Sequence, residues 1–187
     1  MVDRSSITGH ILIDGIDISQ LSLDDLRSHI SVIPQIPVLF CGTLRYNIDP
    51  FQQYSDEECL KALEAVQLRH LVTTHPEGLC RPIAESGGNL SAGESQLICV
   101  ARAILKKSKI LLIDEATANV DYATDKLIQL VITDKFRDRT VLTIAHRFDT
   151  ILKNDRIVIL QNGEVDKVDT PGNIDFHAYS EPTVTRF

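Results

Sequence analysis

The sequence predicts an α/β fold with a mostly parallel sheet, a helical insert and an antiparallel hairpin near the C-terminus. Short apolar runs alternate with segments of helical periodicity along the 187 residues, which is typical of a sheet whose strands are joined by helices. Between residues 42 and 107 the helical signal dominates. Further on, Asn162-Gly163 separates runs 157–161 and 164–168, and this dipeptide is a strong signal for a two-residue hairpin turn.

The strands are expected at short apolar runs. The first, Ile11–Ile13, leads into Asp14-Gly15, which is a turn signal. The others are rich in β-branched residues and do not alternate with polar ones, as is typical of strands covered on both faces. They are Ile30–Ile33, Ile110–Ile113, Val141–Ile144 and Ile157–Leu160.

The helices are predicted by caps and by apolar side chains at helical spacing. Ser55 to Glu58 reads as a capping box, and a helix with an apolar face follows it. A second helix is expected to start at Leu90–Gln96, and a third over residues 122–136 with Asp121 as its N-cap. The apolar positions are Cys59, Leu63 and Val66 in the first helix and Leu97, Val100, Ala101, Ile104 and Leu105 in the second.

Composition excludes several classes of protein. The net charge of -7 argues against a nucleic-acid partner, which needs a basic face. The apolar runs are far shorter than the roughly 20 residues of a membrane-spanning helix, and residues 1–4 do not open a signal peptide. The four cysteines form no C-x-x-C pair, so we expect small buried or half-buried thiols in a reducing, cytosolic compartment.

An acidic pair, Asp114-Glu115, follows the predicted strand Ile110–Ile113. In α/β sheets, ligand chemistry lies at the carboxyl ends of the strands. Asp114 is therefore a candidate to hold Mg²⁺, directly or through water, and Glu115 a candidate to orient or polarise an attacking water. Taken alone, an Asp-Glu pair is also a common exit from a strand into a loop, so its meaning depends on the neighbouring motifs.

The segment L-S-A-G-E-S-Q (Leu90–Gln96) has the features of an anion site. The Ser91 hydroxyl and the backbone N–H groups of Ala92 and Gly93 open a helix, where the dipole also favours negative charge. An ordinary serine N-cap is the alternative interpretation. Glu94 is expected to repel a phosphate unless its side chain points away from it.

These motifs, in this order and spacing, resemble the nucleotide-binding domain of an ATP-binding cassette (ABC) transporter. Gln35 in P-Q-I-P-V-L-F, the tail A-N-V-D after the acidic pair, and His146 complete the set. The stretch G-T-L-R-Y-N-I-D-P-F (Gly42–Phe51) narrows the resemblance to the second such domain of multidrug-resistance-associated (subfamily C) exporters. The resemblance covers about residues 9 to 170 and implies a P-loop-NTPase-like (RecA-like) fold with its helical subdomain at about 42–107.

The resemblance also implies a role for each matching residue. Glu115 would be catalytic, Asp114 would belong to the Walker B motif, and Gln35 would contact Mg²⁺ or the attacking water. His146 would be the switch histidine that donates to the γ-phosphate. The signature residues Ser91, Ala92, Gly93 and Glu94 would cap a nucleotide held by the opposite domain, and Asn119 and Asp121 would form the D-loop between the paired domains.

Several positions depart from the family pattern. None of the nine glycines precedes a lysine, so the sequence has no G-x-x-x-x-G-K-[ST] loop, and we expect an N-terminally truncated domain that lacks the first strands. Ile36 stands where an acidic residue usually follows the glutamine, while Glu94 and Ser95 replace a usual Gln and Arg. Residues 171–187 mix Gly, Pro, Ser and Thr without periodicity and are expected to be a poorly ordered tail.

The expected function is that of an ABC ATPase domain of a membrane exporter, which uses ATP and Mg²⁺ and couples hydrolysis to transport. Its expected partners are a second nucleotide-binding domain and transmembrane domains that hold it at the cytoplasmic face of a membrane. The alternative is a catalytically incompetent module that only supplies its signature motif to a partner. An ABC ATPase of DNA repair or translation is disfavoured by the acidic charge and by residues 33–51.

Overall fold

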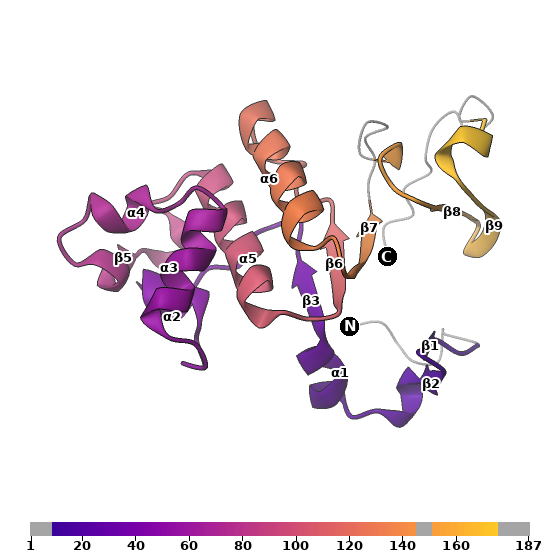
Figure 1. Ribbon diagram of the computed structural model, residues 1–187, viewed down its shortest axis with the longest axis horizontal. Coiled ribbons are helices and arrows are strands. Elements are labelled where there is room, and N and C mark those ends of the chain that lie inside the picture. The colour runs from indigo at the N-terminus through magenta and orange to yellow at the C-terminus, as the bar shows by residue number, and fades with distance from the viewer. Residues whose placement is uncertain (1–8, 145–150, 176–187) are drawn as a thin grey trace. The chain divides into compact units, whose positions relative to one another are not determined.

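The computed structural model describes residues 9–144 and 151–175, and these form a mixed α/β structure (Figure 1). The chain divides into two compact units, Met1–Leu142 and Thr143–Phe187. The first contains the parallel strands and all the helices that carry predicted site residues. His146 lies outside the described residues, as does the tail from residue 176 onward.

The sheet that organises the first unit has the strand order β3-β6-β7. β3 (Ile30–Ile33) and β6 (Ile110–Asp114) pair in parallel, with Ile30 opposite Ile110 and Ile33 opposite Ile113. β7 (Thr140–Ile144) is the third strand. The predicted parallel arrangement is confirmed, and it brings the carboxyl ends of β3 and β6 to the same edge of the sheet.

The segment between β3 and β6 is helical, as predicted. Ser55 caps α3 through a complete capping box with Glu58, and Ser91 caps α5 in the same way. The elements in chain order are β4 (Gly42–Thr43), α2 (Leu44–Ile48), α3 (Asp56–Ala65), α4 (His70–Thr73), η3 (Gly78–Cys80), β5 (Pro82–Ile83), η4 (Glu85–Gly87) and α5 (Ala92–Lys106). β4 and β5 pair in an antiparallel ribbon.

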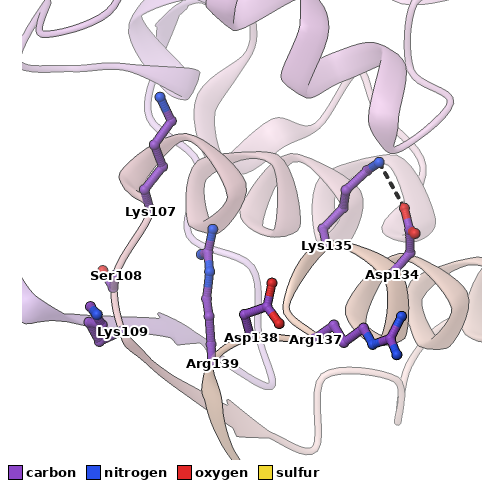
Figure 2. Close-up of a pocket in the computed structure, with 8 residues that line it drawn as sticks. All are labelled: Lys107, Ser108, Lys109, Asp134, Lys135, Arg137, Asp138 and Arg139. Atoms are coloured by element: carbon purple, nitrogen blue, oxygen red, sulfur yellow. Dashed lines mark ion pairs between the residues drawn. The ribbon is translucent and has the colours of Figure 1, made fainter.

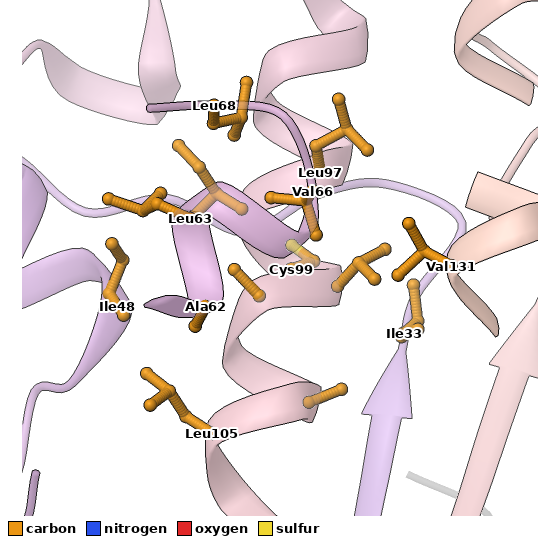
Figure 3. Packing of buried hydrophobic residues seen from close by; sticks show 14 of the residues in the cluster. Ile33, Ile48, Ala62, Leu63, Val66, Leu68, Leu97, Cys99, Leu105 and Val131 are labelled. Atoms are coloured by element: carbon orange, nitrogen blue, oxygen red, sulfur yellow. The ribbon is translucent and has the colours of Figure 1, made fainter. Parts of the chain in front are cut away.

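The core joins this helical segment to the sheet. Figure 3 shows apolar side chains of α3 packed against those of α5, with Ile33 of β3 beside them. Leu63 of α3 and Val66 at its C-cap are fully buried, which is worth about 1.5–3 kcal/mol for each such side chain relative to exposure. The predicted stripe on α5 is buried as well, except that Ile104 is only partly covered.

The remaining elements of the first unit flank this core. β1 (Leu12–Ile13) and β2 (Ile16–Asp17) form a short antiparallel pair around the predicted Asp14-Gly15 turn, and η2 (Ile18–Gln20) follows. α1 (Leu23–His29), capped by Ser22, leads into β3. α6 (Tyr122–Lys135) begins at the Asp121 N-cap and ends at Phe136, within one residue of the prediction.

In the second unit, β8 (Ile157–Gln161) and β9 (Glu164–Asp169) form the predicted antiparallel hairpin, with Gln161 opposite Glu164. Asn162 and Gly163 have φ values of 51° and 83°. Positive φ at both central residues defines a type I′ turn, which matches the twist of the flanking strands. The short helix η5 (Pro171–Asn173) follows β9.

Two expectations about burial are wrong. The apolar strands β3, β7 and β8 are not covered on both faces among the described residues, since Val32, Leu142, Ile144 and Leu160 are 55%, 57%, 60% and 65% exposed. An apolar run shows which side chains favour burial, but it does not show which segment covers them. Of the cysteines, Cys59 and Cys99 are buried within α3 and α5, whereas Cys41, just before β4, and Cys80, at the end of η3, are exposed.

Candidate functional site

Two predicted site residues that lie 80 positions apart in the sequence are in direct contact. Gln35 Nε2 donates a hydrogen bond of 3.0 Å to Glu115 Oε2. Gln35 follows β3 by two residues and Glu115 follows β6 directly, so the parallel register of the two strands causes this meeting. The carboxyl edge of the sheet therefore presents an amide and a carboxylate at one point.

The chain turns sharply at the acidic pair. Asp114 is the last residue of β6 and is exposed, whereas Glu115 is half-buried. Glu115 has φ of 42°, a left-handed conformation that is uncommon for a residue other than glycine and that recurs at functional sites. Its carbonyl accepts from Ala118 N at 3.0 Å, and Ala116 and Thr117 behind it are buried, so the turn is fixed from both sides.

The acidic pair and Gln35 offer oxygen donors that fit Mg²⁺. Magnesium is usually held by one or two carboxylates together with substrate phosphates, rather than by a complete protein cage. Among residues 9–144 and 151–175 there is no group of three or more His, Cys, Asp and Glu side chains that could hold a metal ion on its own. The donor set at this edge, Asp114 with Gln35 and Glu115, is therefore of the kind that shares a metal with a phosphate ligand.

The start of α5 has a reciprocal cap. Ser91 Oγ accepts from Glu94 N at 3.1 Å, while Glu94 Oε2 accepts from Ser91 N at 2.7 Å. The Ser91 hydroxyl oxygen is thus the acceptor in the first bond, and the same hydroxyl interacts with the Glu94 carboxylate and helps to lower its pKa. The N–H groups of Ala92 and Gly93 lie in the first turn of this 15-residue helix, where backbone donors have no partner within the helix.

The carboxylate of Glu94 is held by its neighbours. Its second oxygen, Oε1, lies 3.3 Å from His70 Nε2, so one oxygen faces the Ser91 amide and the other faces an imidazole. Burial acts to raise the pKa of Glu94, but the hydrogen bonds from Ser91 and His70 outweigh it and lower the pKa. The S-x-x-E pattern at Ser91–Glu94 is the signal in the sequence for this capping box.

The turn after the acidic pair leads to Asp121. Asn119 and Asp121 are both exposed. Asp121 Oδ1 accepts from the backbone N–H groups of Ala123 and Thr124, both at 3.0 Å, and Oδ2 accepts from Thr124 Oγ1 at 2.6 Å. The pKa of Asp121 is lowered, chiefly by the hydroxyl of Thr124. Its predicted role as an N-cap is confirmed by this geometry.

Gln96 and Arg102, which were not among the predicted site residues, hold the backbone before and after Gln35. Gln96, which is 1% exposed, donates to Pro34 O at 2.9 Å. The guanidinium of Arg102 donates to Val38 O at 2.6 Å and to Asn47 Oδ1 at 3.1 Å. Both donors belong to α5, so the helix that begins at Ser91 also fixes the backbone on either side of Gln35. A polar residue among apolar helical positions was the only signal in the sequence, and it does not show what the residue contacts.

A hollow of about 300 Å³ lies elsewhere in the first unit (Figure 2). Lys109, in its lining, precedes β6, whereas Asp114 ends that strand; five strand residues at about 3.3 Å each put them about 17 Å apart. α5 and α6 both end beside this hollow, and basic side chains there complement the negative ends of the helix dipoles. The lining residues are Lys107, Ser108, Lys109, Asp134, Lys135, Arg137, Asp138 and Arg139.

Comparisons with known proteins agree with this geometry. Residues 2–118 match the sequence model of the family described as ABC transporter. The chain also resembles a solved structure, that of a bacterial Atm1-family ABC exporter with ATP bound, with a TM-score of 0.80 and 34% identity. That likeness covers 88% of this chain and 29% of the exporter chain. This chain belongs to the ABC transporter family.

Its curated relatives are multidrug-resistance-associated proteins of subfamily C. The chain is 53% identical over 163 residues to the probable multidrug resistance-associated protein lethal(2)03659 of Drosophila melanogaster. It is 52% identical to multidrug resistance protein mrp-7 of Caenorhabditis elegans and 51% identical to ATP-binding cassette sub-family C member 2 of Homo sapiens. Each alignment covers 87% of this chain but only 11–12% of the relative.

Proposed function

We propose that this chain is part of the ATPase domain of a subfamily C exporter, in which ATP hydrolysis is coupled to transport across a membrane. The observation that carries the proposal is the hydrogen bond between Gln35 and Glu115 at the carboxyl edge of the sheet. It places an amide and a carboxylate where an α/β sheet holds its ligand, next to the exposed carboxylate of Asp114.

The residues at this edge have different roles in hydrolysis. Glu115 is the group that orients or polarises the attacking water, and Gln35 fixes one carboxylate oxygen by donating to it. Asp114 and Gln35 supply oxygen ligands for Mg²⁺, which when bound offsets negative charge on the phosphate oxygens. His146 is proposed as the donor to the γ-phosphate, from its position in the sequence alone.

The start of α5 serves a different nucleotide. We propose that Ser91 donates its hydroxyl proton, and Ala92 and Gly93 their N–H groups, to the γ-phosphate of a nucleotide held by a partner domain. Support comes from the capping box, which fixes the position of the Ser91 hydroxyl at the start of α5. The Glu94 carboxylate is engaged by the Ser91 amide and by His70, which reduces its repulsion of the phosphate.

A second candidate function is a module that only provides the surface formed by Ser91, Ala92, Gly93 and Glu94, which we call the signature face. The residues 1–187 contain no G-x-x-x-x-G-K-[ST] loop, so the cradle for the triphosphate must come from a segment outside them or from a partner. The signature face, by contrast, is complete within α5. The proposed setting of both candidates is the cytoplasmic face of a membrane, beside transmembrane partner segments. In the part of the chain that the structure describes, no helix has the length and apolarity needed to span a bilayer.

The substitution Glu115→Gln in the intact transporter tests the proposed activity. The change removes a charge but keeps size and the ability to accept from Gln35, so ATP binding should persist while hydrolysis falls about 10²–10⁴-fold. Phosphate release and binding of a fluorescent ATP analogue measure the two effects. Glu164→Gln, the same chemical change on the exposed hairpin strand β9, is the control and should behave as the parent. Hydrolysis at the parental rate in Glu115→Gln would show that the assigned role is wrong.

A further inference from the structure

One side chain, Thr124, contacts both surfaces that are proposed to face the partner domain. Thr124 is the third residue of α6. Its hydroxyl donates to Asp121 Oδ2 at 2.6 Å. The same side chain packs on Gly93 of the signature segment, because a Cβ built on Gly93 would lie 2.9 Å from Thr124 Oγ1 and 3.1 Å from Thr124 Cγ2. The contact therefore joins the A-N-V-D turn to the start of α5.

The hydroxyl and the methyl group of Thr124 both make contacts. The hydroxyl bond occupies the carboxylate oxygen of Asp121 that the helix cap leaves over, since Oδ1 already accepts the backbone N–H groups of Ala123 and Thr124. A hydrogen bond to a charged acceptor is short and roughly twice as strong as a neutral one. The hydroxyl oxygen and the methyl group both lie over Gly93, and a β-branched side chain has few rotamers in a helix, so the contact with Gly93 and the bond to Asp121 are held together.

An ordinary helix cap does not require this arrangement. A single carboxylate oxygen that accepts from the first N–H groups satisfies the cap, and Asp121 Oδ1 does so without help. The bond from Thr124 adds a fixed orientation of the carboxylate and ties that orientation to the position of Gly93. Asp121 is exposed, so its carboxylate is accessible to another molecule while it is held in this way.

We propose that Thr124 is a positioning residue, which keeps the Asp121 carboxylate and the N-terminus of α5 in one fixed arrangement so that a partner domain meets both together. This inference rests on the proposed role of the signature face. It adds Thr124, a residue outside the recognised motifs, to the residues that determine how these two segments are presented to the partner.

The first test measures the contact itself by ¹³C NMR titration of the Asp121 carboxyl in the 187-residue protein. Thr124→Val keeps the branched shape and the methyl on Gly93 but removes the donor, so the pKa of Asp121 should rise toward its ordinary value. Thr124→Ser, the matched control, keeps the donor and should retain the low pKa. An unchanged pKa in Thr124→Val would overturn the proposal. Circular dichroism checks the fold, and Thr124→Ala replaces the valine variant if that does not fold.

The second test measures pairing with a separate nucleotide-binding domain that contains a G-x-x-x-x-G-K-[ST] loop, followed by light scattering with and without ATP. Thr124→Val should weaken ATP-dependent association about tenfold, as expected for loss of one charge-assisted bond. Thr124→Ser should restore most of it. Parental pairing in Thr124→Val, together with a raised Asp121 pKa, would overturn the positioning role.

The two tests separate the possible failures. If the parent protein itself shows no ATP-dependent pairing, the proposed function of the signature face is wrong. The NMR titration still decides in that case whether Thr124 holds Asp121. A variant whose pKa rises but whose pairing is normal leaves the proposed function intact and removes only the role of Thr124.

Discussion

The contacts of Glu94 in the folded chain differ from what its charge alone predicts. As a charge beside a phosphate site it would oppose binding, but its two oxygens are turned to the Ser91 amide and the His70 imidazole. Its side chain is 26% exposed, so solvent screens the pair with His70 only in part. The residue therefore serves first as a cap that gives α5 a defined start, and the defined start is what presents the N–H groups of the signature segment.

The lowered pKa of Glu94 predicts how stability depends on pH. The pKa in the folded chain lies below its ordinary value of 4.5, so the ionised form adds stability that is fully present above that value and is lost as the pH falls through the folded pKa. His70→Gln removes one of the causes of the shift. The pKa of Glu94 should rise in this variant, and the free energy of unfolding should fall less steeply between pH 5 and about pH 3.

Urea unfolding at several pH values and a ¹³C titration of Glu94 measure the two effects. His75→Gln is a matched control, because His75 lies two residues beyond the end of α4 and has no bond to Glu94 among the described residues. Identical pH slopes and an unshifted Glu94 in His70→Gln would contradict the contribution of His70.

At the scale of elements, the packing of α5 on α6 depends on the absence of a side chain at position 93. The nearest atoms to a Cβ at Gly93 belong to Thr124, at 2.9 Å and 3.1 Å, which is closer than packed side chains normally approach. Both atoms lie on a short, branched side chain that cannot swing away without loss of its bond to Asp121. The glycine of the signature segment thus has a packing role in addition to its proposed contact with phosphate.

Gly93→Ala should therefore destabilise the protein by about 1–3 kcal/mol, the usual cost of overpacking, even though alanine favours helix more than glycine does. The free energy of unfolding in urea measures the change. Gly172→Ala is the control, since nothing lies within 4 Å of a Cβ at that position, and it should stay close to the parent. A gain in stability for Gly93→Ala would mean that α5 and α6 separate easily.

Local signals made most elements predictable. The S-x-x-E box at Ser55, the N-cap at Asp121 and the Asn162-Gly163 turn depend on a few adjacent residues, and all three are present in the structure. The contact between Gln35 and Glu115 could also be predicted from the sequence, because the carboxyl ends of parallel strands lie at the same edge of a sheet. Gln96 and Arg102 were not, since their bonds to the backbone of residues 34–47 depend on where two distant segments come to lie.

At the scale of the whole molecule, the 187 residues hold the groups proposed for hydrolysis but no loop for the triphosphate. In P-loop enzymes a glycine-rich run of backbone N–H groups and a lysine cradle the phosphates. The edge formed by Asp114, Glu115 and Gln35 offers only one amide donor against two carboxylates. These residues suit a metal and a water, and they need another segment to hold the nucleotide.

The 187-residue protein on its own should therefore bind MgATP weakly and release phosphate at a negligible rate. Titration with a fluorescent ATP analogue and a phosphate-release assay measure both quantities. Addition of a P-loop-bearing domain is the positive control for the assay. Micromolar binding with hydrolysis that disappears in Glu115→Gln would contradict the expectation and would show that the chain has a second way to hold the triphosphate.

The bonds from α5 to the loop around Gln35 have a consequence for how this sequence can diverge. One helix starts at the signature segment, holds Pro34 through Gln96 and holds Val38 and Asn47 through Arg102. A substitution that moves the helix should change the proposed hydrolysis edge and the proposed docking surface at the same time. Selection on either surface would therefore act on the same two donors, Gln96 and Arg102, so we expect the two surfaces to be constrained together.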